Sequence, residues 1–364
     1  MRQAITALFL AFILLALPIT ESAQQQQQPP QPPPPDQQNP QQSQTKIIQY
    51  INLVDVLATV LNRRNKLVSD LSKEDFKIMD DGVAQDIRFF NRQSDIPLRI
   101  GLLLDTSNSI RDRLKFEQDA AVNFLYTVLR RGKDQAFAMT FDDEPQIIQG
   151  FTGDTGMLRD QVIKTRAGGG TAVYDAIYEA CSKHLSNPPR PPGDQQDVVR
   201  RVMILISDGE DNLSDHTRAE AVEMAQRTGV VIYTISTSIQ WVTTTAEKDC
   251  RATGTCKYHL TDGDKILQAL AEETGGRSFY PYHVDDLDQS FQDIGDELRN
   301  QYQITYNPSN FVPNGKYHRI KIETPKFNGY QVRARRGYYA RPNGTGTGTS
   351  PANPPAPAAP KPPQ

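Results

Sequence analysis

The sequence lacks a dominant charge of either sign. Its 364 residues include 40 Lys and Arg against 43 Asp and Glu. Without a strong basic field, the chain has no electrostatic basis for nucleic acid or an anionic membrane surface as its main partner. Motifs must therefore indicate what the chain binds.

Motifs of common enzyme classes are also missing. The chain contains no Gly-x-Ser-x-Gly nucleophile elbow and no Gly-x-x-x-x-Gly-Lys phosphate loop. Phosphate-transferring hydrolases place a second Asp two residues after their nucleophile, where this chain has Ser107. No general base and no small-molecule substrate is evident. We therefore predict that the protein is not an enzyme, with metal-assisted hydrolysis as a less favoured alternative.

The N-terminal apolar run is too short for an ordinary membrane span. Residues 4–17 are apolar, Arg2 precedes them, and small residues including Ser22 and Ala23 follow. This order is typical of a secretory signal peptide, which we place at residues 1–23. A span needs about 20 apolar residues, so a retained anchor is the weaker alternative. We expect an exported protein (periplasmic, on the outer surface or secreted) that meets a membrane only if this segment is retained.

Cysteine is rare, and its three positions fit export. Cys250 and Cys256 lie in an insertion at residues 239–259, where an oxidising compartment would let them form a disulfide. Cys181 lies in a predicted helix, and we expect it to be a buried free thiol. If the signal peptide is wrong, all three would be reduced.

Low-complexity segments bracket the ordered part of the chain. Residues 24–46 are rich in Gln and Pro, and residues 342–364 are rich in Pro, Gly and Ala. Neither segment has enough apolar side chains to form a core, so we predict a disordered linker and a disordered tail.

Short strand patterns open and close the ordered part. The N-terminal module, residues 47–93, has strand patterns at 48–60 and 75–79, then an Asp81-Gly82 hairpin turn that residues 85–90 complete. Residues 302–341 have strand patterns at 302–306, 318–323 and 330–335. Neither set can bury its own apolar face. We predict that the two sets pack together as a small β-sandwich-like domain.

Residues 97–301 alternate buried strands with helices. Mainly apolar runs, typical of strands covered on both faces, occupy residues 98–104, 136–141, 199–207 and 230–236. An edge strand is predicted at 146–151. Helical periodicity occupies residues 113–130, 174–185 and 218–227, and recurs around Ile266 and Phe291. The alternation predicts an α/β fold, Rossmann-like, with a mostly parallel central sheet and helices on both faces.

Three polar loops follow these strands or precede a helix, at the edge where such sheets bind ligands. They are DTSNS at 105–109, AGGGT at 167–171 and SDG at 207–209. The candidate metal ligands are Asp105, Ser107, Ser109, Thr171 and Asp208. Oxygen ligands alone favour a hard cation, Mg²⁺ or alternatively Mn²⁺ or Ca²⁺, over Zn²⁺. The alternative is that these loops only cap strands and helices.

The three loops resemble the metal-ion-dependent adhesion site of the von Willebrand factor type A (vWA) family. The resemblance covers about residues 97–301. The flanking sequence, from the DFKIMDDG segment to RARRGYYARP, resembles an exported vWA-related group common in acidobacteria. It implies that the hydroxyls of Ser107, Ser109 and Thr171 bind the metal directly, while Asp105 and Asp208 act mostly through water. One coordination position would stay open for an Asp or Glu carboxylate of a partner protein.

Other polar residues are weaker candidates. Asp142, Asp175, Glu210 and Asp211 could surround the metal ligands or line the rim, or could be solvated loop and helix-start acids. The histidines show no metal-ligand spacing, so we expect surface roles for His184, His216, His259, His283 and His318.

These features together predict an exported, metal-dependent protein-binding module for adhesion or scaffolding. The alternative is a structural envelope protein in which the metal only stabilises the fold.

Overall fold

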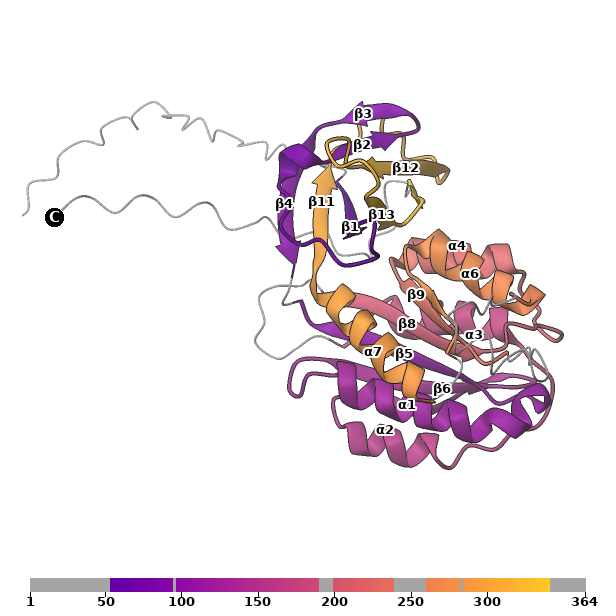
Figure 1. Cartoon of the computed structure of the whole chain (residues 1–364). Helices are drawn as coiled ribbons and strands as arrows, with labels where there is room; N and C mark the ends of the chain where they lie inside the picture. The colour runs from indigo at the N-terminus through magenta and orange to yellow at the C-terminus, as the bar shows by residue number, and fades with distance from the viewer. Residues whose placement is uncertain (1–52, 94–95, 190–198, 239–259, 282–283, 341–364) are drawn as a thin grey trace, which may run out of the picture. The chain divides into compact units, whose positions relative to one another are not determined.

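The computed structural model describes residues 53–93, 96–189, 199–238, 260–281 and 284–340 (Figure 1). All of them belong to one compact unit of the chain, Tyr50–Gln364. The predicted signal peptide, linker and tail, and the insertion with Cys250 and Cys256, lie outside the described residues. Among the described helices, none is long and apolar enough to cross a membrane.

A six-stranded sheet with the order β10-β9-β8-β5-β6-β7 forms the centre of the α/β part. Its strands are β5 (Leu98–Asp105), β6 (Gln135–Phe141), β7 (Pro145–Thr152), β8 (Arg200–Ser207), β9 (Val231–Ser236) and β10 (Ser278–Phe279). All neighbours pair in parallel except β7, which runs antiparallel to β6 at the edge. Every residue of β5 is buried, including Arg99, as its mainly apolar run predicts. The predicted fold class is confirmed.

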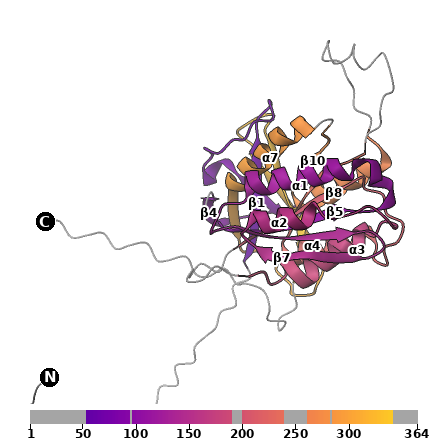
Figure 2. The same ribbon diagram turned by 90° about the horizontal axis from the view of Figure 1, so that it is seen from below.

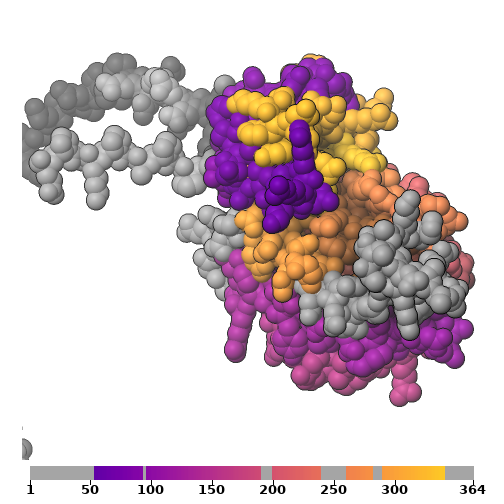
Figure 3. All heavy atoms as spheres, in the orientation of Figure 1, coloured from indigo at the N-terminus to yellow at the C-terminus, as the bar shows by residue number. Residues whose placement is uncertain are grey.

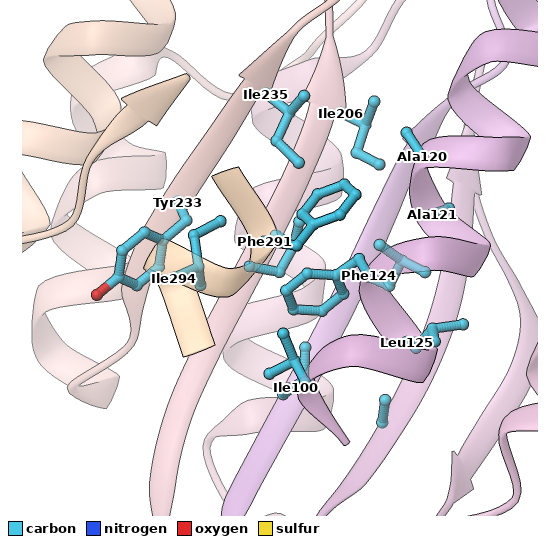
Figure 4. Close-up of a cluster of buried hydrophobic side chains, with 14 of the residues drawn as sticks. Ile100, Ala120, Ala121, Phe124, Leu125, Ile206, Tyr233, Ile235, Phe291 and Ile294 are labelled. Carbon is cyan, nitrogen blue, oxygen red and sulfur yellow. The ribbon is translucent and has the colours of Figure 1, made fainter. Parts of the chain in front are cut away.

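Helices cover both faces of this sheet. They are η2 (Asn108–Arg113), α1 (Leu114–Val128), α2 (Thr155–Val162), α3 (Val173–Glu179), η3 (Ala180–Leu185), α4 (Arg218–Thr228), α6 (Asp262–Thr274) and α7 (Val284–Arg299). Figure 2 shows α1 and α7 on one face and α3 and α4 on the other. Each face has its own cluster of buried apolar side chains. In the first, the rings of Phe124 and Phe291 meet edge to face with centroids 5.5 Å apart (Figure 4).

Two four-stranded antiparallel sheets flank the α/β part, with the orders β13-β1-β11-β4 and β14-β12-β2-β3. Their elements are β1 (Val54–Leu61), η1 (Lys73–Asp75), β2 (Lys77–Asp80), β3 (Val83–Gln85), β4 (Ile87–Gln93), β11 (Gln301–Tyr306), β12 (Tyr317–Glu323), β13 (Gln331–Ala334) and β14 (Gly337–Tyr339). Each sheet combines strands from both ends of the sequence, so indigo and yellow atoms mix in Figure 3. Both sheets contribute to one apolar core that includes Val56, Ile78 and Ile304. We call these two sheets the flanking sandwich.

The hairpin predicted in the N-terminal part is only partly present. Asp81 and Gly82 have φ of 47° and 83°, the left-handed conformation that the turn requires, and they join β2 to β3. However, residues 87–90 do not complete this hairpin as predicted, because β4 pairs with β11 in the other sheet. The chain changes sheets after Gln85, which allows one short segment to contribute to both layers.

The flanking sandwich is joined to the α/β part at two adjacent points. The chain leaves the sandwich after β4 and returns through α7 into β11, where Gln93 and Gln301 are paired across the two strands. Glu297 near the end of α7 is 1% exposed. Its Oε1 accepts hydrogen bonds from Thr59 (3.1 Å) and Tyr233 (3.2 Å), and its Oε2 from Arg333 (2.7 Å). Side chains from both parts therefore meet at one buried carboxylate.

Candidate functional site

The three predicted loops lie together at one end of the central sheet. Strands β5 and β8 are parallel neighbours with Leu104 opposite Ile206, so the loops after them start side by side. The glycine loop joins them through its backbone. The Gly168 N–H donates to the carbonyl oxygen of Thr106 at 2.8 Å. Topology, rather than sequence proximity, therefore assembles the candidate site.

Four of the five predicted ligands form a continuous chain of hydrogen bonds. The Asp105 carboxylate accepts the Ser107 N–H at 2.9 Å. The Ser107 and Ser109 hydroxyl oxygens lie 2.9 Å apart. The Ser109 hydroxyl then donates to Oδ2 of Asp208 at 2.8 Å. The structure therefore brings Asp105, Ser107, Ser109 and Asp208 together, although Ser109 and Asp208 are 99 residues apart in sequence.

Thr171, the fifth predicted ligand, is tied to the loop that follows Asp208. Its backbone N–H donates to Oδ1 of Asn212 at 2.9 Å, and its carbonyl accepts the N–H groups of Asn212 (3.0 Å) and Leu213 (3.1 Å). Thr171 is 3% exposed. Glycine at position 170 allows the two loops to approach this closely, because a Cβ there would lie 2.3 Å from a side-chain carbon of Leu213.

Burial disfavours the negative charge of the carboxylates at the candidate site. Asp105 is fully buried, which raises its pKa to about 6 despite hydrogen bonds from Ser107 and Ser207 that lower it. The nearby Asp208 raises that pKa further. Two close carboxylates in a buried setting favour either a proton or a cation between them.

Glu117 in the first turn of α1 adds a third carboxyl behind the site. It is fully buried, and neither carboxyl oxygen makes a hydrogen bond of normal geometry. Burial raises its pKa well above the usual value, and Asp105 and Asp208 act in the same direction. We did not predict this residue from sequence, because an acid in the first turn of a helix is ordinarily a solvated partner of the helix dipole.

The four rim candidates are placed differently from one another. Asp175 accepts the N–H groups of Asp215 and His216, and Asp211 accepts the N–H of Val173 at the start of α3. These bonds orient two loops around the site. Asp142 accepts the Ala172 N–H through its backbone carbonyl. The exposed Glu210 lies beside Ser109 and Asp208 in a groove.

A second group with metal-ligand chemistry lies in the flanking sandwich. Side-chain atoms of Asp80, Asp81 and His318 lie within 4.8 Å of one another. The His318 Nδ1 is 2.9 Å from an Asp81 oxygen, and Tyr306 and Tyr338 donate to Oδ2 of Asp80 at 2.8 and 2.9 Å. The predicted surface role is wrong for His318, whose side chain is 14% exposed. No sequence spacing could reveal this group, because β2 and β12 pair across most of the chain.

Cys181 is a buried free thiol, as predicted, and burial raises its pKa to about 12. Cys250 and Cys256 lie outside the described residues, so their disulfide stays a prediction.

Residues 100–297, more than half of the chain, match the model of the von Willebrand factor type A domain family. The chain belongs to the vWA family. vWA domains are protein-interaction modules that are typically non-catalytic, and many carry a metal-ion-dependent adhesion site. No curated protein matches the chain.

Several solved structures are similar to this vWA protein at low sequence identity. A vWA protein from Catenulispora acidiphila is 11% identical, with 81% of this chain and 74% of that chain covered and a TM-score of 0.43. BatB from Bacteroides thetaiotaomicron is 18% identical, with 55% and 98% covered and a TM-score of 0.40. Proximal thread matrix protein 1 from the mussel byssus, solved with zinc in its adhesion motif, is 17% identical, with 59% and 48% covered and a TM-score of 0.42.

Proposed function

We propose that this protein is an exported, non-catalytic binding module that captures an acidic residue of a partner protein through a divalent cation. The cation is Mg²⁺, with Mn²⁺ or Ca²⁺ as alternatives, held by Ser107, Ser109 and Thr171 with Asp105 and Asp208 behind them. The observation that carries the proposal is the hydrogen-bond chain from Asp105 to Asp208, which links two loops through their side chains.

The donor set fits a hard cation that keeps affinity for a further anion. All five side chains offer oxygen, which Mg²⁺ and Ca²⁺ prefer. Three of the donors are neutral hydroxyls, so they leave much of the positive charge uncompensated. When bound, the cation supplies an electrophilic centre for a carboxylate. The residues around it hold the serine hydroxyls at short, fixed separations.

A binding role without catalysis fits the partners of the two serines. In the described part of the chain, the hydroxyls of Ser107 and Ser109 bond to each other and to Asp208, and neither bonds to a histidine or lysine. A serine nucleophile ordinarily needs such a base. We therefore propose that these hydroxyls act as ligands.

The proposed export and domain plan extend beyond the α/β part. We propose a signal peptide at 1–23, a linker at 24–46 and a tail at 342–364. We also propose that 47–93 and 302–341 form one domain beside a vWA domain at 97–301, which the strand pairing of β1 with β11 supports. N-terminal sequencing of the protein recovered from the cell envelope tests the signal peptide, and a start at Met1 would refute it.

The test of the metal site is calorimetry with envelope capture. Asp105→Ala and Thr171→Ala should each weaken Mg²⁺ binding and abolish chelator-sensitive capture of partners from a cell envelope fraction. Asp112→Ala is the matched control, because Asp112 is an exposed acid in the short helix η2 that follows the Asp105 loop. Unchanged metal affinity in both site variants would refute the assignment. Capture that survives chelation while the melting temperature falls would favour the structural alternative, in which the metal only stabilises the fold.

A further inference from the structure

Helix α3 begins without a cap of its own. Its N-cap residue is Ala172, whose side chain cannot accept a hydrogen bond. Helices commonly have Ser, Thr, Asp or Asn at this position, because their first N–H groups have no partner within the helix. Thr171, a proposed metal ligand, immediately precedes Ala172. The contacts that hold this helix start therefore also hold one side of the proposed metal site.

The loop after β8 supplies the missing cap. Oδ1 of Asp211 accepts the Val173 N–H at 2.8 Å and the Ser214 hydroxyl at 2.6 Å. The Ser214 oxygen in turn accepts the N–H groups of Tyr174 at 3.0 Å and Asp175 at 3.2 Å. Two side chains from another loop therefore satisfy the three N–H groups of the first turn.

This cap connects the loops that carry two proposed ligands. Asp208 lies three residues before Asp211, and Thr171 lies two residues before Val173. The bond from Val173 to Asp211 therefore fixes the Thr171 loop against the Asp208 loop. The backbone of Thr171 strengthens the same connection through its two bonds with Asn212, at 2.9 and 3.0 Å.

The cap requires a hydrogen-bond acceptor at position 211 but not a negative charge. The side chain of Asp211 accepts from Val173, Tyr174 and Ser214, and all three bonds end on Oδ1. The oxygen of an asparagine amide has the same position and can accept the same bonds. An asparagine variant therefore separates capping from charge.

We propose that Asp211 and Ser214 are positioning residues of the metal site. They cap α3 from the neighbouring loop and thereby hold Thr171 in place relative to Asp208. Residues that orient metal ligands raise metal affinity, because the ligands are already arranged when the ion binds. This inference rests on the proposed function, because it concerns the cation that Thr171 and Asp208 would share.

The test measures Mg²⁺ affinity of the full chain by calorimetry. Asp211→Ala should bind Mg²⁺ roughly tenfold more weakly than the wild type, the scale for residues that orient metal ligands. Asp211→Asn should keep most of the affinity and lose no more than Asp215→Asn. Asp215 is an exposed acid of the same loop, so its variant measures the effect of the lost charge alone. Ser214→Ala should also weaken binding, and it provides a second variant if Asp211→Ala folds poorly.

A cap at a distant helix separates positioning from stability. Asp154 caps α2 by accepting the N–H groups of Gly156 and Met157. The strand before it, β7, ends opposite the start of β6, whereas the candidate site lies beyond the ends of β5 and β8. Asp154→Ala removes an acid and a helix cap, as Asp211→Ala does. It should lower the melting temperature but leave the Mg²⁺ affinity unchanged.

Four results would contradict the inference. Wild-type affinity in Asp211→Ala, or in Ser214→Ala where the first variant does not fold, would overturn it and leave the proposed function standing. Equal losses in Asp211→Ala and Asp211→Asn, beyond the loss in Asp215→Asn, would assign Asp211 a charge role instead. An equal loss in Asp154→Ala would attribute the effect to general instability. A wild-type protein that binds no Mg²⁺ would refute the proposed function and this inference with it.

Discussion

The hydroxyl of Ser109 donates a 2.8 Å hydrogen bond to Oδ2 of Asp208, joining the loop after β5 to the loop after β8. Both groups offer oxygen atoms that a hard cation prefers. In the absence of a cation, the serine proton screens one carboxylate oxygen. Coordination through a lone pair of the Ser109 oxygen would retain that hydrogen bond, so the two residues should respond together to metal.

Replacing Asp208 tests this relationship. Asp208→Asn keeps the shape of the side chain but removes its charge. If Asp208 holds the cation through water, the Mg²⁺ affinity measured by calorimetry should fall roughly 10–100-fold. Glu210→Gln is the control, because Glu210 is the exposed acid two residues away and should change the affinity much less. Equal losses in both variants would indicate a general charge effect and count against a specific role for Asp208.

Acid should weaken metal binding through Asp105. Its pKa in the folded protein is about 6, above the ordinary 3.8, so the folded state binds this proton more tightly than the unfolded chain does. Without metal, the stabilisation from this proton is therefore present below about pH 4 and is lost as pH rises toward 6. A cation requires the ionised carboxylate and has the opposite pH dependence. The Mg²⁺-induced rise in melting temperature should therefore be larger at pH 7.5 than at pH 5.

Two variants separate this mechanism from a general acid effect. Asp105→Asn should give little Mg²⁺-induced rise at either pH. Ser107→Ala should give a smaller rise than the wild type but keep its pH dependence, because it retains the titrating carboxyl. An equal Mg²⁺ effect at both pH values in the wild type would show that Asp105 does not control binding.

The cysteines should differ in chemical state. We expect Cys250 and Cys256 to be joined in the exported protein, whereas the buried Cys181 should stay a thiol that alkylating reagents reach only after denaturation. Mass spectrometry of the protein alkylated under native and then denaturing, non-reducing conditions distinguishes all three. Alkylation of both Cys250 and Cys256 without reduction would contradict the disulfide or the oxidising compartment.

The flanking sandwich should depend on both ends of the chain. β11 lies between β1 and β4, so truncation after Gln301 removes the central strand of that sheet together with β12 to β14. We expect residues 47–93 to become sensitive to protease while residues 97–301 resist, which limited proteolysis with mass spectrometry would show. A protease-resistant N-terminal fragment in the truncated protein would mean that it folds alone.

The sequence allowed the central sheet and the loop positions to be predicted because each depends on local patterns. The run at 98–104 is apolar except for Arg99, and strand ends in parallel sheets share an edge, so Asp105 and Asp208 could be placed together. The helix α2 was missed although its N-cap was visible: Asp154 accepts the N–H groups of Gly156 and Met157. The Asp154 N-cap can be recognised from sequence alone, but the helix that follows is too short to show a clear helical periodicity.

Features set by distant contacts could not be predicted. Nothing local indicates that β4 leaves the hairpin begun by β2 and β3, because β11 supplies its pairing partner. The approach of His318 to Asp80 and Asp81 likewise depends on pairing between β12 and β2. Burial of Glu117 arises from packing around the start of α1, which a periodic pattern does not resolve.

The pairing of Gln93 with Gln301 has a mechanical consequence. The chain enters and leaves the α/β part at neighbouring positions of the adjacent antiparallel strands β4 and β11. The hydrogen bonds between these strands therefore connect the two ends of the α/β part directly. A pulling force applied to the chain termini is then carried by the flanking sandwich, and the vWA domain lies outside the load path. While the sandwich remains folded, tension along the backbone leaves the loops around Ser109 and Asp208 undistorted. A pull exerted through a bound partner instead enters at those loops and reaches the sandwich through its two adjoining strands.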